Sequence, residues 1–465
     1  MTRPATGIVH LGLGAFFRAF GCVYVADAMA ASGGDWGILG ACLRRPDTRD
    51  ALRAREWAYN CVSLAPDREE LRDITVLNDV LVAPENPQAL LAAVADPQVK
   101  IVSLTVTEKG YCHDPATGAL NFNHPDIQHD LENPLPVSAL GYLLRGLQMR
   151  RAAGHAPFTV LCCDNLPDNG TLLRGLLLQM AKRLDPPLAG WIETEGRFPC
   201  TMVDRITPAT TQADVARISA ELGYEEAAPV LHEPFAQWVI EDDFVGGQRP
   251  DFAAAGAEMV QSVTAHEHMK LRMLNGAHSA LAYLGYLAGH ESIAATVADP
   301  AFARYLRALW AEIMPTVQPP EGVDLETYAD ALFARFANSA IHHRTWQIAM
   351  DGSQKLPQRL LGTLEDRLAA GQDAPALMLA VAAWIRYANG MDETGTPIDL
   401  RDPMAARFQE IAAQGLTPEQ TVAAFLALRE VFPENLAAQL RGPVCDAARR
   451  LWAIGASRTL QESFP

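Results

Sequence analysis

The sequence predicts an α/β domain with a mostly parallel sheet over residues 1–265 and an all-α domain over residues 266–465. The first prediction rests on short β-rich runs that alternate with helical stretches, and the second on long helical segments that follow one another from about His266 onward. The length of 465 residues, with 49% hydrophobic and 20% charged side chains, allows each domain to bury a core of its own.

In the amino-terminal part, apolar runs predict buried strands and longer periodic stretches predict helices. Strands that alternate with helices favour βαβ units and a mostly parallel sheet covered on both faces. The expected strands are 7–11, 36–43, 101–106 and 158–163, the expected helices are 15–31, 87–95 and 136–153, and short strand candidates follow at 230–232 and 238–240.

The carboxy-terminal part carries few strand signals, so we place a domain boundary near residue 265. The helices expected there include 301–313, 325–337, 374–387 and 418–428.

Composition excludes several function classes. Lys and Arg number 38 against 55 Asp and Glu, a net charge of −17, which disfavours nonspecific binding to nucleic acid or to an anionic membrane. No apolar run approaches the length of about 18 residues that a membrane span needs, and the amino end lacks a signal peptide pattern. The eight cysteines form no C-x-x-C pair and are expected to be reduced. We therefore expect a cytoplasmic protein that acts on a small molecule, with an oligomeric state that the sequence does not give.

A glycine turn directly follows the first expected strand. Gly12 and Gly14, in Gly-Leu-Gly, precede a helical pattern, so the backbone could approach a pyrophosphate at a helix amino end, as in a Rossmann-like domain. Phe17 stands where the third glycine of G-x-G-x-x-G is usual, which demands a looser helix contact or a different turn. The alternative is a glycine turn that binds no ligand.

The choice between NAD and NADP is open from the residues alone. Arg44 and Arg45 follow the second strand and could bind a 2′-phosphate, whereas Asp47 could bind a ribose diol.

A polar stripe opens the helical domain. Measured at about 100° per residue from Lys270, Glu267 falls near 60°, His278 near 80° and Asn275 near 140°, so all four share one helix face. A partly dehydrated Lys270 can act as general base in alcohol oxidation and as general acid in carbonyl reduction, with Glu267 as a proton relay. Asn275 would hold the developing alkoxide and His278 would orient substrate hydroxyls. The alternative is a solvated helix face.

Competing chemistries lack their residues. No tyrosine begins a Y-x-x-x-K motif, and Gly289-His290-Glu291 lacks the glycines and cysteine of a zinc site, so no metal is expected.

With these residues, the chain resembles the polyol-specific long-chain dehydrogenases, the mannitol dehydrogenase family. Its K-x-x-x-x-N-x-x-H signature is matched by Lys270, Asn275 and His278, and the similarity covers nearly the whole length. Further matching blocks are IVHLGLGAFFRAF (8–20), IVSLTVTEKGY (101–111), CCDNLPDNG (162–170), TMVDRITP (201–208), QWVIEDDF (237–244) and HRTWQIAMDGSQKLPQR (343–359).

The resemblance implies an NAD-dependent enzyme without a metal. It assigns Lys270 as acid/base catalyst, Asn165 and Asn275 to the carbonyl oxygen, and Asp204 and His278 to the polyol. The residues expected at the cofactor are Gly12, Gly14, Phe16, Arg44, Asp47, Thr105 and Glu108.

Within the family, block 343–359 is most similar to the fructuronate reductases, also called mannonate oxidoreductases. The expected reaction interconverts D-fructuronate and D-mannonate, with His343, Arg344 and Lys355 at the substrate and Arg344 able to bind its carboxylate bidentately. The alternatives are the same chemistry on a neutral polyol, mannitol to fructose, and a noncatalytic sensor on the same scaffold.

Overall fold

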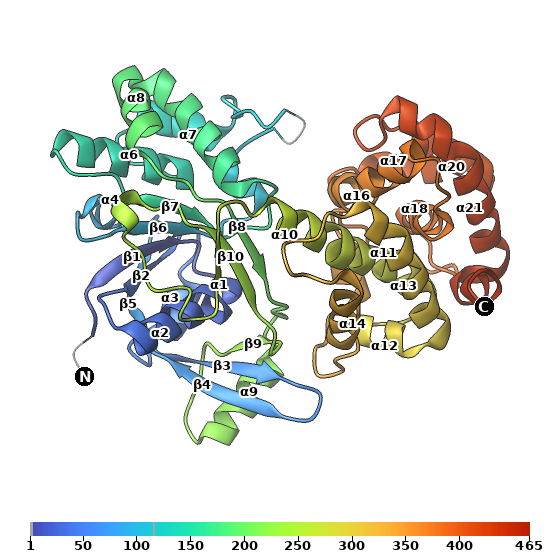
Figure 1. Cartoon of the computed structure of the whole chain (residues 1–465), viewed down its shortest axis with the longest axis horizontal. Coiled ribbons are helices and arrows are strands. Elements are labelled where there is room, and N and C mark those ends of the chain that lie inside the picture. The colour runs from blue at the N-terminus through green and yellow to red at the C-terminus, as the bar shows by residue number, and fades with distance from the viewer. Residues whose placement is uncertain (1–2, 115–116) are drawn as a thin grey trace. The chain divides into compact units, whose positions relative to one another are not determined.

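The computed structural model describes residues 3–114 and 117–465. Met1 and Thr2, part of the amino end in which no targeting segment is expected, lie outside it. Contacts divide the chain into two compact units, residues 1–264 and 265–465. The predicted fold class, an α/β unit followed by a helical one, is confirmed (Figure 1).

The first unit is built on a five-stranded parallel sheet. Its strands lie in the order β5-β2-β1-β6-β7, which in chain order along the sheet is 3-2-1-4-5. Four of the five strands match the expected ones within one or two residues, and β5 was not predicted. The bounds are β1 Thr6–Leu11, β2 Gly37–Cys42, β5 Leu77–Val82, β6 Ile101–Leu104 and β7 Thr159–Cys162.

Helices cover both faces of this sheet because its strands point apolar side chains alternately to either side. Val9 of β1 packs into the core formed with α4, α6 and α7, whereas its neighbour Ile8 packs into the core formed with α1 and α2 (Figure 1). The helices of the unit are α1 Ala15–Ala19, α2 Gly21–Ser32, α3 Asp47–Arg53, α4 Pro87–Ala95, α5 Pro125–Glu132, α6 Ala139–Ala152, α7 Asn169–Leu184, α8 Pro186–Glu195 and α9 Gln212–Leu222.

Two small sheets complete the unit. One has the order β11-β10-β8 and the other β4-β3-β9. The expected strands at 230–232 and 238–240 are present as β9 and β10, whereas the β3–β4 hairpin was not predicted. The bounds are β3 Tyr59–Leu64, β4 Glu69–Ile74, β8 Thr201–Asp204, β9 Val230–His232, β10 Gln237–Glu241 and β11 Glu258–Val260.

The second unit packs helices around one apolar core that contains Trp384, whose ring meets Phe408 and Phe425 edge to face. Two of its segments are π-helical, Lys270–Gly276 and Pro357–Leu361. The α-helices are α10 Thr264–Met269, α11 Ala277–Leu287, α12 Ile293–Ala298, α13 Pro300–Ile313, α14 Leu325–Phe336, α15 Thr345–Ala349, α16 Gly352–Leu356, α17 Gly362–Ala369, α18 Pro375–Ala388, α19 Ala405–Ala412, α20 Pro418–Leu426 and α21 Glu434–Ser463.

None of the helices formed by the described residues combines the length and hydrophobicity needed to cross a membrane.

Candidate functional site

The strand order of the large sheet reverses between β1 and β6. From β1 the chain builds outward through β2 and β5, then returns to place β6 on the other side of β1. Ligands of open parallel sheets bind at the carboxyl ends of strands beside such a reversal. The loops that follow these two strands carry Gly12 and Gly14, and Thr105 and Glu108, all predicted to bind the cofactor.

The turn after β1 requires glycine at position 12. Gly12 has a φ of +93°, and a Cβ there would lie 2.1 Å from the carbonyl oxygen of Thr105. A Cβ on Gly14 would meet only the Gly12 oxygen, at 3.9 Å, so the space beside Gly14 is open. Because α1 begins directly after Gly14, its first amides have no partners within the helix. The turn therefore fits a phosphate group.

His10 holds this turn from below. Its Nδ1 contacts the Ser103 hydroxyl and its Nε2 the Thr105 hydroxyl, each at 2.9 Å, and Thr105 donates to the Gly12 carbonyl at 2.8 Å. Because the Thr105 hydroxyl donates its proton to the Gly12 carbonyl, its oxygen accepts a hydrogen bond from His10. The ring proton of His10 is therefore on Nε2. Burial lowers the pKa of His10 to about 3, so the ring is neutral. Thr105 thus positions the glycine turn.

Phe17 changes the helix that follows. Its ring stacks on His10 with centroids 3.3 Å apart, and a Cβ on Gly21 would lie 2.2 Å from it. Glycine at position 21 therefore leaves space for the Phe17 ring, which stands where the third glycine of the motif is usual. The prediction of a single helix over 15–31 is wrong, because non-helical backbone angles at Phe20 divide it into α1 and α2. Phe16 is half-buried and stacks on Phe20 at 5.1 Å.

The loop after β6 is anchored by Asp164, which the sequence reasoning missed. Its carboxylate accepts from the Val106 amide at 2.8 Å and from the Tyr111 hydroxyl at 2.6 Å. Burial raises the pKa of Asp164 in spite of these bonds. Between them, Thr107 has a φ of +65°, a strained conformation of the kind that clusters at ligand sites. Glu108 follows it and is exposed. A carboxylate directly after a buried strand was the available signal.

Arg44, Arg45 and Asp47 are exposed beyond the carboxyl end of β2, and Asp47 is the first residue of α3. All three are accessible, so the geometry of the unit does not choose between a ribose diol and a 2′-phosphate.

A buried amide links the loops that carry two predicted substrate residues. Asn169 donates to the Asp164 carbonyl at 3.0 Å and accepts from the Thr201 amide at 2.9 Å. The first loop carries Asn165, which is exposed, and the strand that starts at Thr201 ends at Asp204, which is 4% exposed.

In the second unit, Lys270 and Asn275 lie on the π-helical segment, which corrects the angles expected from an α-helix. Because π-helical hydrogen bonds join residues five apart, Asn275 lies about one turn beyond Lys270 on nearly the same side of the helix. An α-helix would have placed Asn275 about 140° away from Lys270 around the helix axis. Lys270 is 5% exposed and Asn275 is half-buried. Trp310 donates to the Met273 carbonyl at 2.9 Å, so a neighbouring helix supports the widened backbone. Glu267 is half-buried, three residues before Lys270 on α10.

The two π-helical segments pack against each other. A Cβ on Gly276 would lie 2.7 Å from the backbone oxygen of Arg359, so only glycine permits this approach. Arg359 in turn donates to the Ser279 hydroxyl at 3.0 Å. The second segment thereby sets the position of the first and brings a guanidinium next to His278.

His278 lies in a positively charged environment. Its ring stacks on Phe336 and meets His343 at a centroid distance of 4.6 Å. Burial lowers the pKa of His278 well below its ordinary value, and the largest charge effects, from His343, Arg359, Arg335 and Lys355, act in the same direction.

His343 and Lys355 belong to the same cluster. Burial, aided by Lys355, lowers the pKa of His343 to about 4. Lys355 donates to the Met350 carbonyl at 2.6 Å and to that of Ile348 at 3.3 Å, at the carboxyl end of α15. Its ammonium group is therefore held in place.

Arg344 lies elsewhere. The backbone is extended at this residue, so the side chains of His343 and Arg344 leave the chain on opposite sides. His343 meets His278, whereas Arg344 is exposed and lines a separate pocket of about 330 Å³ with His290, Trp346 and others. The structure thus brings His343 and Lys355 to His278 but does not bring Arg344 there.

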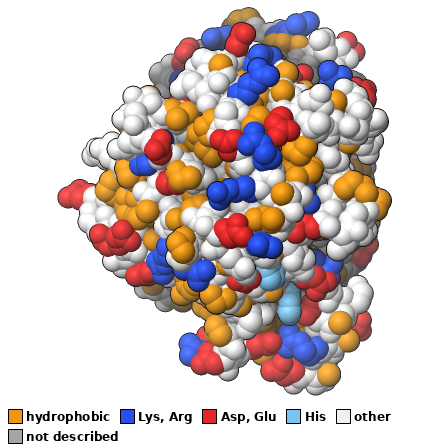
Figure 2. Space-filling model, turned by 90° about the vertical axis from the view of Figure 1, so that its right-hand side faces the viewer, with side chains coloured by type: hydrophobic (Ala, Val, Ile, Leu, Met, Phe, Trp, Pro, Cys, Tyr) orange, Lys and Arg blue, Asp and Glu red, His pale blue; other side chains and the backbone are white. Residues whose placement is uncertain are grey.

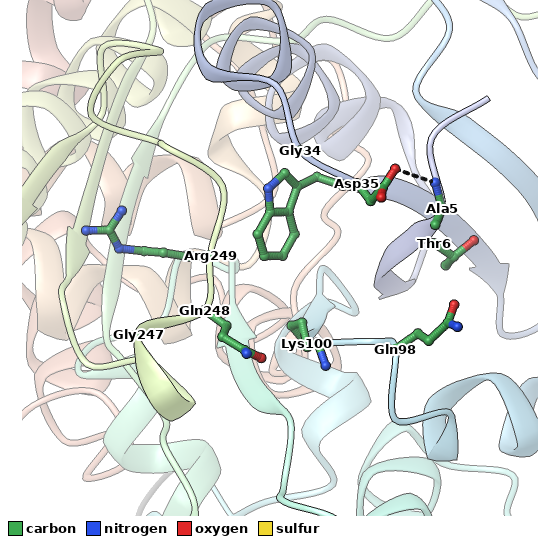
Figure 3. Close-up of a pocket in the computed structure, with 10 residues that line it drawn as sticks. Ala5, Thr6, Gly34, Asp35, Gln98, Lys100, Gly247, Gln248 and Arg249 are labelled. Atoms are coloured by element: carbon green, nitrogen blue, oxygen red, sulfur yellow. Dashed lines mark hydrogen bonds between the residues drawn. The ribbon is translucent and has the colours of Figure 1, made fainter. Parts of the chain in front are cut away.

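A further cavity, of about 510 Å³, lies at the amino ends of the strands of the parallel sheet, where Thr6 starts β1 and Lys100 precedes β6. In Figure 3, Gln98, Lys100 and Gln248 surround the space beside an indole ring. The cavity is separate from the glycine turn, because that turn lies at the carboxyl ends of the same strands. Figure 2 shows basic, acidic and apolar side chains interspersed over the face that it draws, without a field of one sign among the described residues there.

A parallel sheet with a glycine turn at its reversal point, and a second, helical unit with a buried lysine, indicate a dinucleotide-dependent dehydrogenase of two domains. The model of the mannitol dehydrogenase Rossmann domain matches residues 6–253, and that of the mannitol dehydrogenase C-terminal domain matches residues 262–448. The chain therefore belongs to the mannitol dehydrogenase family, which confirms the resemblance seen in the sequence, and it is a dehydrogenase.

Similar proteins span nearly the whole chain. It is 46% identical to D-mannonate oxidoreductase of Escherichia coli (strain K12), over 98% of this chain and 95% of that protein. The structure of Pseudomonas fluorescens mannitol 2-dehydrogenase in ternary complex with NAD and D-mannitol is 36% identical, with a TM-score of 0.90 over 99% of this chain and 94% of that one. A D-sorbitol dehydrogenase in substrate-free form is 32% identical, with a TM-score of 0.87 over 98% and 95% of the two chains.

Proposed function

We propose that this protein interconverts D-fructuronate and D-mannonate with NAD as cofactor, and that Lys270 is the acid/base catalyst. The observation that carries the choice of a sugar acid is the positive environment of His278, made by Arg335, Lys355 and Arg359. A carboxylate is favoured in such a place because opposite charges attract strongly where water is excluded. The 46% identity to a D-mannonate oxidoreductase supports the same choice.

The first unit would hold the cofactor. Gly12 and Gly14 would face its pyrophosphate, because the space beside Gly14 is open and the first amides of α1 lack helical partners. The similar mannitol 2-dehydrogenase is in complex with NAD, so we assign Asp47 to the ribose diol of NAD, and NADP, which Arg44 and Arg45 could accept, is the alternative to be tested. When bound, the cofactor supplies or accepts the hydride.

Lys270 would move the proton. In the reductive direction its ammonium group donates a proton to the carbonyl oxygen of the substrate, and in the oxidative direction its amine removes the proton of the hydroxyl. Burial keeps Lys270 out of bulk water. Asn275, about one π-helical turn away, and Asn165 would donate hydrogen bonds to the oxygen as its charge develops.

The two neutral histidines would orient the substrate hydroxyls. Because the pKa values of His278 and His343 are both lowered, each ring offers one donor and one acceptor nitrogen at neutral pH. Asp204 would accept from a further hydroxyl.

Two places could hold the carboxylate, the cation cluster at His278 and the pocket that contains Arg344. We assign the carboxylate to the cation cluster, because this cluster surrounds His278, a residue of the K-x-x-x-x-N-x-x-H signature. Lys355→Met keeps an apolar stem and removes the charge, and Arg344→Met is the matched control in the same unit. Loss of a charge-assisted contact worth about 1.5–3 kcal/mol lowers kcat/KM roughly 10- to 150-fold.

The test measures kcat/KM of each variant for D-mannonate and D-mannitol, with NAD and with NADP. We expect Lys355→Met to lose activity on mannonate selectively and Arg344→Met to lose little on either substrate. The opposite pattern would move the carboxylate to the Arg344 pocket. Equal activity of the unchanged protein on both substrates would favour the second candidate, mannitol oxidation to fructose, which the similarity to the mannitol 2-dehydrogenase supports. Absence of any change in nicotinamide absorbance with either substrate would overturn both candidate reactions and point to another polyol or sugar acid as the substrate.

A further inference from the structure

A cluster of three potential metal ligands lies outside the residues used above. The side chains of Cys112, His124 and Asp126 place their donor atoms within 4.8 Å of one another, the only such group of at least three His, Cys, Asp or Glu residues found across 3–114 and 117–465. Cys112 is buried, and the other two residues are half-buried. Sulfur, imidazole nitrogen and carboxylate oxygen are the three donors that protein zinc sites use.

The cluster is held together by local backbone structure. Cys112 directly follows the short 3₁₀ helix Glu108–Tyr111, and its carbonyl accepts from the Asn121 amide at 2.9 Å. His124 caps the amino end of α5, where its Nδ1 accepts from the Asp126 amide at 3.2 Å. Because Nδ1 accepts this bond, its lone pair faces the turn that carries the carboxylate.

The spacing suits one ion. With metal–ligand bonds of about 2.0–2.3 Å, two donors on a tetrahedral zinc lie roughly 3.5 Å apart, so the side chains need to move by about 1 Å to close on it. Three protein ligands leave the fourth position for water. His124 would bind through one of its ring nitrogens, and Nδ1 would do so only by giving up its hydrogen bond from the Asp126 amide.

We propose that Cys112, His124 and Asp126 form a zinc-binding site. The ion would tie the segment after β6 to the start of α5. That segment includes Tyr111, whose hydroxyl donates to Asp164 at 2.6 Å, and Asp164 anchors the loop that carries Thr107 and Glu108. Zinc would therefore stabilise the first unit and the loop after β6, without taking part in hydride or proton transfer.

The thiol gives the binding a distinct signature. A cysteine thiol, with an ordinary pKa of about 8.5, is protonated at pH 7. Zinc binds the thiolate, so binding at pH 7 should release about one proton. Cobalt at the same site should show a thiolate-to-metal charge-transfer band.

The test uses the full-length protein without NADH. Zinc binding is followed by calorimetry in two buffers of different ionisation enthalpy, cobalt binding by absorbance, and stability by the melting temperature. We expect one zinc per chain, release of about one proton, a charge-transfer band, and a melting temperature that rises with zinc. Cys112→Ser should abolish the band, and His124→Gln and Asp126→Asn should each weaken zinc binding at least tenfold.

Matched controls are Cys445→Ser, at a half-buried thiol on α21, and His155→Gln, at an exposed histidine. Both should bind zinc like the unchanged protein. Unaltered binding in His124→Gln and Asp126→Asn, or a cobalt complex without the charge-transfer band, would overturn the proposal. These readouts are independent of activity, so failure of the zinc site and failure of the proposed reaction can be told apart.

Discussion

Gly276→Ala should separate the two π-helical segments and damage the Lys270 segment. The backbone at Gly276 is helical, with φ −63° and ψ −51°, so alanine would by itself gain about 1 kcal/mol of helix propensity. Its Cβ would however lie 2.7 Å from the Arg359 oxygen, which is a backbone atom and cannot rotate away. Overpacking of this kind costs about 1–3 kcal/mol, and a backbone clash belongs at the upper end. We expect a net loss of about 1–2 kcal/mol.

Gly362→Ala is the matched control. Gly362 has helical φ −61° and ψ −37° in the same unit, and a Cβ there makes only ordinary contacts, at 3.8 Å to Arg272 and 3.9 Å to the Pro357 oxygen, so alanine should stabilise the protein by about 1 kcal/mol. The two variants should then differ by about 2–3 kcal/mol in the free energy of unfolding, read from the transition of the helical unit in urea. Since they change the same unit, this difference does not depend on whether the two units unfold together.

Activity gives a second measure of Gly276→Ala. A displacement of a few tenths of an ångström at Lys270 and Asn275 should lower kcat about tenfold, because misplacement by about 1 Å costs roughly 100-fold. NAD affinity, which belongs to the other unit, should not change. If Gly276→Ala is as stable and as active as Gly362→Ala, the contact between the two π-helical segments does not position Lys270.

Three further predictions concern the proton donor, the cofactor loop and pH. Lys270→Met should lower kcat by about 10²–10⁴-fold on every substrate while NADH binding, followed by fluorescence, is unchanged; a small loss would remove Lys270 as catalyst. Asp164→Asn should weaken NAD binding about tenfold, because the carboxylate accepts from Val106 and Tyr111 on one oxygen and from Thr107 on the other, and the NH2 group of an amide cannot accept in place of the second oxygen; unaltered affinity in calorimetry would show that the loop needs no such anchor. The pKa values of His10 and His343 are lowered to about 3 and about 4, whereas histidine titrates near 6.5 in the unfolded chain. The unfolded chain therefore binds more protons in this window, so stability is complete above pH 6.5 and should fall by up to about 1.4 kcal/mol per pH unit for each histidine as pH is lowered toward 4. Urea titrations with a flat pH profile would contradict the buried, neutral state of both rings.

The sheet was predictable where the chemistry was local. Each of the four expected strands is a short apolar run, and burial on both faces of a parallel sheet requires such runs. The strand β5, Leu77–Val82, contains Asn78 and Asp79 and so lacks that pattern. It joins the sheet by parallel pairing with β2, which buries Leu77, Val80 and Val82, and Asn78 donates to the Pro4 carbonyl at 2.8 Å, a contact 74 residues away that periodicity cannot reveal.

The two halves of the site were predictable to different extents. Gly12 was found because a turn that approaches another backbone closely allows no side chain, and this leaves a glycine in the sequence. The helix interruption at Phe20 was missed because apolar residues continue on both sides of it. The sequence also does not say which aromatic ring will face which histidine, as Phe17 faces His10.

The sequence by itself determined the class of chemistry, because the glycine turn and the spacing of Lys270, Asn275 and His278 are properties of neighbours along one chain. Only the tertiary structure decided how those residues are presented. Gly276 lets the Arg359 backbone pack closely against the π-helical segment, and the positive environment of His278 arises from helices that are remote in sequence. The direction of the Arg344 side chain was also decided by the tertiary structure. The backbone there is extended, so Arg344 lies on the side of the chain opposite to His343, which contacts His278.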